Sequence, residues 1–246
     1  LVMRTGSFTG RAARDRYIVK DELTRESVAW GSLNQAIDVE SYAALRAHIE
    51  KSIAGRESYV LTRHAGGAEG LPVRVHTTSP AHALFCRHLF QAPRPELSGA
   101  GLLILHVPEC RAIPGIHGTA GATFIVIDAR ARTILIGGTA YAGEIKKAVF
   151  SYLSFVLPAR GILPMHAAVN VGDWGDSAVF FGLSGTGKTA LSADPERHLL
   201  GDDEHAWSER GVFNLEGGCY AKTIGLSEAA QPALWRAVHT PLTLVE

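Results

Sequence analysis

The chain has 246 residues, which is enough for one large domain or two small ones. Apolar residues make up 46% and charged residues 20%, an ordinary globular composition that can fill a hydrophobic core. Basic and acidic residues both number 24, so the net charge is zero and gives no electrostatic reason to expect nucleic acid or an anionic membrane as a partner.

The sequence carries no signal for membrane insertion or secretion. Its apolar runs fall short of the roughly 20 residues of a membrane-spanning helix, and no signal peptide is visible. The three cysteines, Cys86, Cys110 and Cys219, are odd in number and widely spaced. This spacing argues against a disulfide framework or a cysteine zinc site, so we expect a cytoplasmic protein. The sequence opens inside a motif and stops in an apolar run, which we interpret as an internal fragment of a longer protein.

Near the beginning, residues 4–18 form a glycine-spaced segment rich in arginine, with Arg11 directly after Gly10. Guanidinium groups bind carboxylate or phosphate through two parallel hydrogen bonds, so this segment can hold an anionic ligand. A solvated basic turn is the alternative.

The next part of the chain alternates between helical and extended patterns. Apolar residues at helical spacing predict an amphipathic helix over 38–53, and a second helix is expected over 81–90. Runs that favour strands lie at 58–61, 71–75, 102–105, 122–127 and 133–136. We therefore predict an α/β fold that starts with a mixed sheet and a few helices.

A glycine-rich turn follows the last of these strands and precedes an apolar helix predicted over 148–157. It places Tyr141, Lys146 and Lys147 at a strand-to-helix junction, where ligands are often held. A solvated helix face is the alternative for the two lysines. Proline and glycine then interrupt the pattern, so we predict an N-terminal domain over 1–160 and a nucleotide-binding domain, incomplete in this chain, over 161–246.

Residues 182–189 read G-L-S-G-T-G-K-T and fit G-x-x-x-x-G-K-S/T, the phosphate-binding P-loop. The apolar run 177–181 before it predicts a buried strand, and residues 190–193 can open a helix. The glycines let backbone N–H groups point at phosphate oxygens, Lys188 adds a charge, and Thr189 can offer its hydroxyl to Mg²⁺. A flexible Gly/Ser/Thr loop is the alternative.

Two acidic residues, Asp202 and Asp203, follow a short apolar segment downstream of this loop. Carboxylates are hard oxygen ligands suited to Mg²⁺ or Mn²⁺, and such residues serve as metal ligands in P-loop enzymes. An acidic surface turn is the alternative. His166, taken alone, is more often a packed core histidine than a metal ligand.

As a set, these segments resemble ATP-dependent phosphoenolpyruvate carboxykinase over nearly the whole chain. The matching motifs occur in the family's order: R-T-G-S-F-T-G-R at 4–11, Y-A-G-E-I-K-K at 141–147, L-P-M-H at 163–166, F-F-G-L-S-G-T-G-K-T at 180–189, L-S-A-D-P at 191–195, G-D-D-E-H at 201–205 and F-N-L-E-G-G-C-Y-A-K-T at 213–223. The GTP-using relatives have a cysteine in the phosphate loop, so this chain is similar to the ATP form.

The resemblance implies a lyase of gluconeogenesis that converts oxaloacetate and ATP into phosphoenolpyruvate, ADP and CO₂. It implies one Mg²⁺ that travels with the nucleotide and one Mn²⁺ bound by the protein. The catalytic residues implied are Arg11 at the substrate carboxylate or CO₂, Tyr141 beside the same pocket, Lys146, Lys147, Ser184 on the substrate side of the loop, Lys188 at the phosphates, and Asp202 orienting a metal-bound water. Mn²⁺ would be bound by Lys147, His166 and Asp203, and Mg²⁺ by Thr189. The nucleotide would contact Gly182, Leu183, Ser184, Gly185, Thr186, Gly187, Lys188, Thr189 and Ala190, with Gln231 standing where the family commonly has a glutamate.

The chain also departs from the family's pattern. The usual G-R-S-P-K-D-K reads G-R-A-A-R-D-R at 10–16, which we expect to loosen the loop of Arg11. The family's adenine pocket and one substrate arginine lie beyond Glu246, so we expect this chain alone to be inactive. We also expect a monomeric protein. Another P-loop phosphotransferase, or a non-catalytic fragment that binds nucleotide or metal, remains an alternative.

Overall fold

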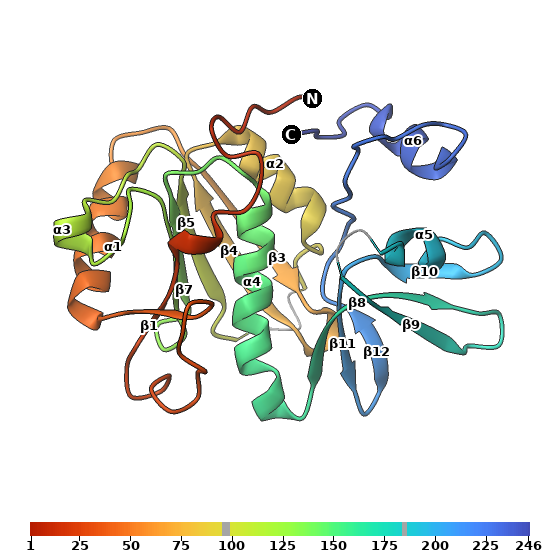
Figure 1. Cartoon of the computed structure of the whole chain (residues 1–246), viewed down its shortest axis with the longest axis horizontal. Helices are drawn as coiled ribbons and strands as arrows, with labels where there is room; N and C mark the ends of the chain where they lie inside the picture. The colour runs from red at the N-terminus through yellow and green to blue at the C-terminus, as the bar shows by residue number, and fades with distance from the viewer. Residues whose placement is uncertain (95–98, 184–185) are drawn as a thin grey trace.

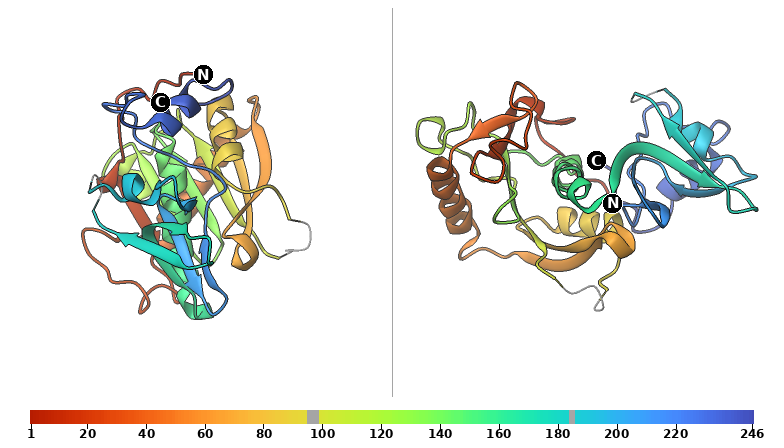
Figure 2. Two further views of the ribbon diagram at one scale, coloured as in Figure 1. Left: turned by 90° about the vertical axis from the view of Figure 1, so that its right-hand side faces the viewer. Right: turned by 90° about the horizontal axis from the view of Figure 1, so that it is seen from below.

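The structure is a computed structural model that describes residues 1–94, 99–183 and 186–246. It contains two β-sheets, one formed by the strands up to residue 137 and the other by the strands from residue 163 onward (Figure 1). A long helix, α4 (Gly143–Val156), connects the two along the chain. Seen from below, α4 stands nearly end-on between them (Figure 2).

The first sheet is mixed, as the sequence predicts. In spatial order its seven strands are β2 (Gln35–Ile37), β1 (Arg16–Val19), β6 (Phe124–Asp128), β7 (Thr133–Gly137), β5 (Leu102–Val107), β4 (Leu71–Thr77) and β3 (Tyr59–Ala65). The pairs β6–β7 and β3–β4 are antiparallel, and the other neighbours run parallel. Strands β6 and β7 are buried along their whole length, since helices cover both faces.

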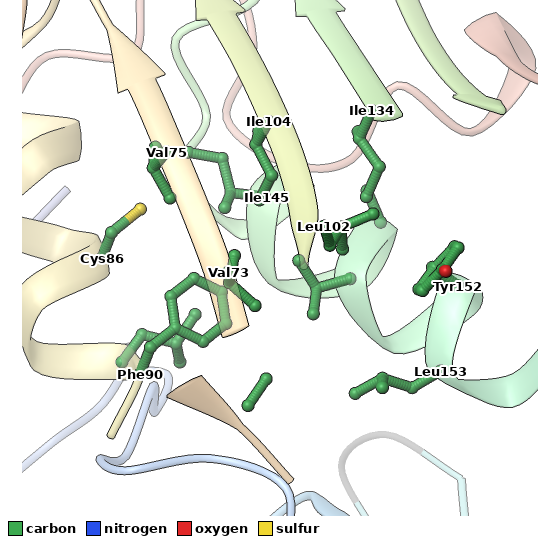
Figure 3. Packing of buried hydrophobic residues seen from close by; sticks show 14 of the residues in the cluster. Val73, Val75, Cys86, Phe90, Leu102, Ile104, Ile134, Ile145, Tyr152 and Leu153 are labelled. Atoms are coloured by element: carbon green, nitrogen blue, oxygen red, sulfur yellow. The ribbon is translucent and has the colours of Figure 1, made fainter. Parts of the chain in front are cut away.

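Helix α1 (Val39–Ile53) covers one face of this sheet, and α2 (Pro80–Leu89) and α4 cover the other. Because side chains alternate along a strand, Leu135 packs in the cluster with α1, whereas Ile134 and Ile136 pack in the cluster with α4. Figure 3 shows the cluster that includes α4, with Val75 and Ile104 of the sheet facing Ile145 of α4. The short helix α3 (Pro114–His117) packs beside α1.

Helix α4 begins five residues earlier than the sequence predicts, at Gly143 rather than at residue 148. The glycine is required by crowding, because a Cβ atom at Gly143 would lie 2.5 Å from the ring of Tyr141. As a result, Lys146 and Lys147 lie on the first turns of the helix. Helix α1 confirms the prediction over 38–53, with the side chain of Asp38 accepting a hydrogen bond from the N–H of Ser41.

The second sheet is entirely antiparallel. Its strands are β10 (His198–Gly201), β8 (Leu163–Val171), β11 (Glu204–Ser208) and β12 (Gly211–Asn214) in that order, with β9 (Ser177–Phe181) also paired to β8. Strand β8 changes partner along its length: residues 163–166 pair with β11, and residues 167–171 pair with β9. The remaining elements are the helices α5 (Lys188–Ser192) and α6 (Pro232–Val238) and the 3₁₀ turns Ala13–Asp15, Gly67–Glu69 and Pro158–Arg160.

The prediction of a buried strand over 177–181 is wrong as to burial. Strand β9 forms there, but its central residues are only half-buried and the side chain of Phe181 is 67% exposed. In the described part of the chain β9 pairs only with β8, and the short helix α5 packs against it. An edge strand with little cover cannot bury both of its faces.

The two ends of the chain lie side by side (Figure 1). Val2 and Val245 form a short parallel bridge, with hydrogen bonds from Met3 N–H to Val245 O and from Val245 N–H to Leu1 O. Within the described residues, no helix is long and apolar enough to cross a membrane.

Candidate active site

The two lysines of α4 reach a group of acidic residues on the second sheet. Lys146 Nζ lies 2.9 Å from Asp203 Oδ2 and 2.9 Å from Glu216 Oε1, and its side chain is 2% exposed. Lys147 Nζ lies 2.9 Å from Asp203 Oδ2 and forms a second ion pair with Glu204 Oε1. Helix α4 is thus joined to the second sheet by ion pairs. The two lysines do not form a solvated helix face.

The register between β8 and β11 places His166 against the same acidic residues. Glu204 is directly opposite His166 in the pairing of the two strands. Asp203 lies in the turn just before β11, where its carbonyl accepts a hydrogen bond from Ala167 N–H at 2.9 Å. His166 Nε2 and Asp203 Oδ1 are hydrogen-bonded at 2.5 Å. The structure therefore brings Lys147, His166 and Asp203 together from three separate elements.

Three of these side chains form a candidate metal site. His166, Asp203 and Glu204 each offer one ligand atom, and these atoms lie within 4.8 Å of one another. Carboxylate oxygens suit Mn²⁺ and Mg²⁺, whereas imidazole nitrogen suits a transition-metal ion rather than Mg²⁺. Glu204 is fully buried, and among the residues that the structure describes its Oε2 atom has no hydrogen-bond partner, so this oxygen is free to bind a cation. The donor set thus fits a divalent metal.

Sequence reasoning missed Glu204 and Glu216. Both stand inside matching motifs, G-D-D-E-H and F-N-L-E-G-G, but the spacing alone does not show which acidic side chains turn toward the lysines. For Glu204 the decisive fact is its register opposite His166. For Glu216 it is the ion pair with the buried Lys146.

Burial and the neighbouring charges shift the pKa values of the site's acidic groups in different directions. Burial would raise the pKa of Asp203, but the hydrogen bond from His166 and the charges of Lys146 and Lys147 outweigh it and hold that pKa well below its usual range. Burial raises the pKa of Glu204 to about 8 against the opposing charge of Lys147. Burial likewise raises the pKa of Glu216 to about 7, although Lys146 opposes the shift. The Asp203 carboxyl thus has the lowest pKa of the three acidic groups.

Arg11 and Tyr141 lie near the start of α4. The side chain of Arg11 is exposed, whereas the adjacent Ala12 is buried. Tyr141 is half-buried; burial is the main cause that raises its pKa, and the charges of Arg11 and Lys146 oppose it. The ring of Tyr220 connects the two groups, since its centroid lies 6.4 Å from that of Tyr141 and 5.8 Å from Lys146 Nζ. Tyr220 was not singled out from the sequence.

The glycine loop lies between β9 and α5. Ser184 and Gly185, which the resemblance assigns to the site, lie outside the described residues. Lys188 Nζ donates hydrogen bonds to the carbonyls of Gly182 at 2.8 Å and Leu183 at 3.3 Å, so its ammonium group lies within the curve of the loop. Gly187 has a φ of +93° and precedes α5, a conformation that favours glycine.

The other predicted nucleotide contacts are spread over the loop and beyond it. Thr186 donates its hydroxyl to Leu183 O at 2.7 Å, and Thr189 and Ala190 are exposed on α5. Gln231 is exposed immediately before α6, and the interactions found for it within the described residues do not reach the loop. The structure thus groups the loop residues but leaves Gln231 apart from them.

Asp202 is buried, unlike an acidic surface turn, and is hydrogen-bonded to the thiol of Cys219. Partial desolvation, followed by the charge of Asp202, raises the pKa of the Cys219 thiol, although this cysteine is exposed at the surface.

Comparisons with known proteins agree with this arrangement. The family model of phosphoenolpyruvate carboxykinase matches residues 1–246. Curated proteins named phosphoenolpyruvate carboxykinase (ATP) are similar to the chain: that of Brevibacillus brevis is 45% identical over 96% of the chain, that of Deinococcus radiodurans 47% over 100%, and that of Afipia carboxidovorans 49% over 96%. The matches cover 46%, 54% and 45% of these relatives, so the chain spans about half of their length. From its first residue to its last, the chain belongs to the ATP-dependent phosphoenolpyruvate carboxykinase family.

Proposed function

We propose that the protein to which this chain belongs converts oxaloacetate and ATP into phosphoenolpyruvate, ADP and CO₂, as a step of gluconeogenesis. The observation that carries the proposal is the convergence of Lys147, His166 and Asp203 on one point beside Lys146. A P-loop phosphotransferase of another kind would not require a lysine and a histidine at its metal. A non-catalytic fragment would not require the buried Lys146 to keep two carboxylate partners.

In this proposal Lys147, His166 and Asp203 hold Mn²⁺, and Glu204 is a further candidate ligand. When bound, Mn²⁺ polarises the carbonyl of oxaloacetate and stabilises the enolate that decarboxylation leaves. Lys147 can bind a metal only as a neutral amine, so it must release its proton and its ion pairs with the carboxylates when the ion enters.

The remaining residues bind substrate and nucleotide. Arg11 grips a carboxylate of oxaloacetate or the departing CO₂, and Tyr141 lies beside the same pocket. Lys146, held as a cation by Asp203 and Glu216, adds positive charge where the enolate forms. Lys188 binds the phosphates of ATP, Thr189 holds the Mg²⁺ that accompanies it, and Asp202 orients a metal-bound water.

The candidate site residues are divided between two proposed domains, each built around one of the two sheets. We propose an N-terminal domain over 1–160 that presents Arg11, Tyr141 and the two lysines, and a nucleotide-binding domain over 161–246 that presents the loop, His166 and Asp203. We also propose a monomeric, cytoplasmic protein.

Mn²⁺ binding to the purified chain tests the metal site. Asp203→Asn keeps the shape of the side chain but removes the anion, so we expect Mn²⁺ affinity to fall at least about 10-fold in an electron paramagnetic resonance titration. Asp176→Asn is the matched control, since Asp176 is an exposed carboxylate that also pairs with a cation, Arg197, at 2.8 Å. Equal Mn²⁺ affinity in wild type and Asp203→Asn would exclude the metal site and the function built on it.

A further inference from the structure

One buried carboxylate ties the loop of Arg11 to the start of α4. Glu144 lies in the first turn of the helix with a fully buried side chain. Its Oε1 atom accepts a hydrogen bond from the N–H of Ala12 at 2.6 Å. Ala12 is 5% exposed, while Arg11, the residue before it, is exposed. From this contact we propose that Glu144 is a positioning residue that fixes the backbone after Arg11 and so aims the guanidinium at the anion.

Both backbone groups of Ala12 are held. Its N–H is bound by Glu144, and its carbonyl accepts a hydrogen bond from Asp15 N–H at 3.0 Å. The 3₁₀ turn that begins after Ala12 has no side-chain cap of its own, since alanine offers no acceptor. The carboxylate of Glu144, on helix α4, therefore supplies the hydrogen-bond acceptor that the residues of the loop lack. This contact opposes the loosening of the Arg11 loop that the sequence predicts.

The charges around Glu144 favour the same role. Arg11, Arg16 and Asp15 are the ionisable groups that act on it, so two cations face it against one anion. Arg16 is itself fixed by a hydrogen bond from Nη2 to Ser151 Oγ of α4 at 2.7 Å. The second carboxylate oxygen of Glu144, Oε2, is buried and has no hydrogen-bond partner in the described part of the chain. A buried carboxylate with one free oxygen is costly, and the charges of Arg16 and Arg11 offset part of this cost.

The inference rests on the proposed role of Arg11 as the group that binds the substrate anion. Oxalate is a suitable probe because it is a planar dianion that resembles the α-keto acid end of oxaloacetate. With Mn²⁺ present, we expect Glu144→Ala to weaken oxalate binding about 10-fold or more in a calorimetric titration. Glu144→Gln keeps an acceptor oxygen at the same place and should stay within about 3-fold of wild type. Hydrogen exchange of the Ala12 amide should accelerate in Glu144→Ala and stay slow in Glu144→Gln.

A double variant shows whether Glu144 acts through Arg11. We expect Arg11→Ala/Glu144→Ala to bind oxalate no more weakly than Arg11→Ala alone, because the residue being positioned is gone. Asp38→Ala is the control: it removes a carboxylate that binds a backbone N–H at the start of α1, remote from the site, and should leave oxalate binding unchanged. If Glu144→Ala does not fold, Glu144→Asp replaces it, since the shorter side chain cannot reach Ala12 and should weaken oxalate binding about as much.

The outcomes separate the two claims. If Arg11→Ala weakens oxalate binding and Glu144→Ala does not, the positioning role is wrong and the role of Arg11 stands. An additive loss in the double variant also overturns positioning, because Glu144 would then act independently of Arg11. If Arg11→Ala leaves oxalate binding unchanged, the proposed role of Arg11 is wrong and the positioning proposal falls with it.

Discussion

Lys146 is the most thoroughly enclosed cation of the site. Burial alone would lower its pKa, but the carboxylates of Glu216 and Asp203 raise it above the usual range. Its ammonium group is also 5.8 Å from the centroid of the Tyr220 ring. Lys146 stabilises the fold mainly by balancing the charge of its buried carboxylate partners, because a buried carboxylate without a cation beside it strongly destabilises the folded state.

We expect Lys146→Met to lower the free energy of unfolding by about 3–5 kcal/mol, since Glu216 would be left as a buried carboxylate without a partner. Adding Glu216→Gln should recover part of this loss. Urea denaturation of the two variants measures both effects, with Lys51→Met on the exposed side of α1 as the control. A loss no larger than that of Lys51→Met would show that the ion pairs contribute little to stability.

Lys188 should behave in the opposite way, with an effect on ligand and little on stability. Its ammonium group bonds only to the carbonyls of Gly182 and Leu183 in the described loop, positions from which phosphate oxygens can attract it. We expect Lys188→Met to weaken ATP binding by about 10-fold or more without changing the melting temperature of the free chain. Fluorescence titration with an ATP analogue checks this, and unchanged affinity would contradict the P-loop assignment.

At the scale of elements, α2 meets the first sheet through a pair of buried histidines. His82 lies between Ser79 Oγ at 2.8 Å and Ala140 O at 3.0 Å, and its ring centroid is 4.2 Å from that of His106 on β5. His106 is bonded through Nδ1 to Thr77 Oγ1 at 2.8 Å. Neither ring can take up a proton without placing a charge in the core.

This pair should make the fold sensitive to acid. Burial lowers the pKa of His82 from 6.5 to about 4, although the Ala140 carbonyl and Glu109 oppose the shift. Burial, followed by the charge of His82, also holds the pKa of His106 well below its usual value. Between pH 6.5 and 4 the unfolded chain therefore binds more protons than the folded one, and stability falls as the pH falls. For His82 the loss reaches about 3 kcal/mol at the acid end of this window.

The raised pKa values of Glu204 and Glu216 make the unfolding free energy rise as the pH falls, which opposes the effect of the histidines. The test therefore compares the pH dependence of variants with that of wild type. We expect His82→Gln to flatten the dependence of the unfolding free energy on pH relative to wild type. His198→Gln, at an exposed histidine, should not change that slope. Equal slopes for all three proteins would show that His82 is accessible to protons in the folded state.

Strands β3 to β7 of the first sheet and helix α1 could be predicted from the sequence, whereas the short strands β1 and β2 were not predicted. The helix over 38–53 depends only on apolar residues at helical spacing. The strands around 71–75 and 133–136 depend only on short local runs of residues that favour strands. Strand β8 could not be predicted in this way, because it changes partner in the middle and carries a proline at position 164. The candidate metal ligands could be named only through family resemblance, and Glu204 required the register of two strands.

At the scale of the whole molecule, the two sheets differ in how well they are covered. Strands β6 and β7 are buried throughout, whereas β9 is half-exposed, and Phe181 and Leu191 leave 67% and 63% of their surface open to solvent. Buried apolar area is the main source of stability, so the second sheet is held less firmly than the first.

We expect hydrogen exchange of this chain to show this difference directly. Amides of β9 and β10 should exchange at least about 10-fold faster than those of β5 and β7, because they open by local fluctuations. Adding ATP with Mg²⁺ should slow exchange in the described part of the loop and in α5 while leaving the first sheet unchanged. Equal protection across both sheets would show that the exposed apolar surface does not limit stability.

The pairing of β8 with β11 has a consequence for insertions and deletions. A shift of β8 by a single residue would bring Met165 or Ala167 opposite Glu204 and turn the imidazole of His166 to the other face of the sheet. A methyl group cannot bind a metal, and a thioether is a poor ligand for Mn²⁺. A one-residue gap between Leu163 and His166 should therefore abolish Mn²⁺ binding even where the fold survives, whereas substitutions at exposed positions of the same strand, such as Leu163, should be tolerated.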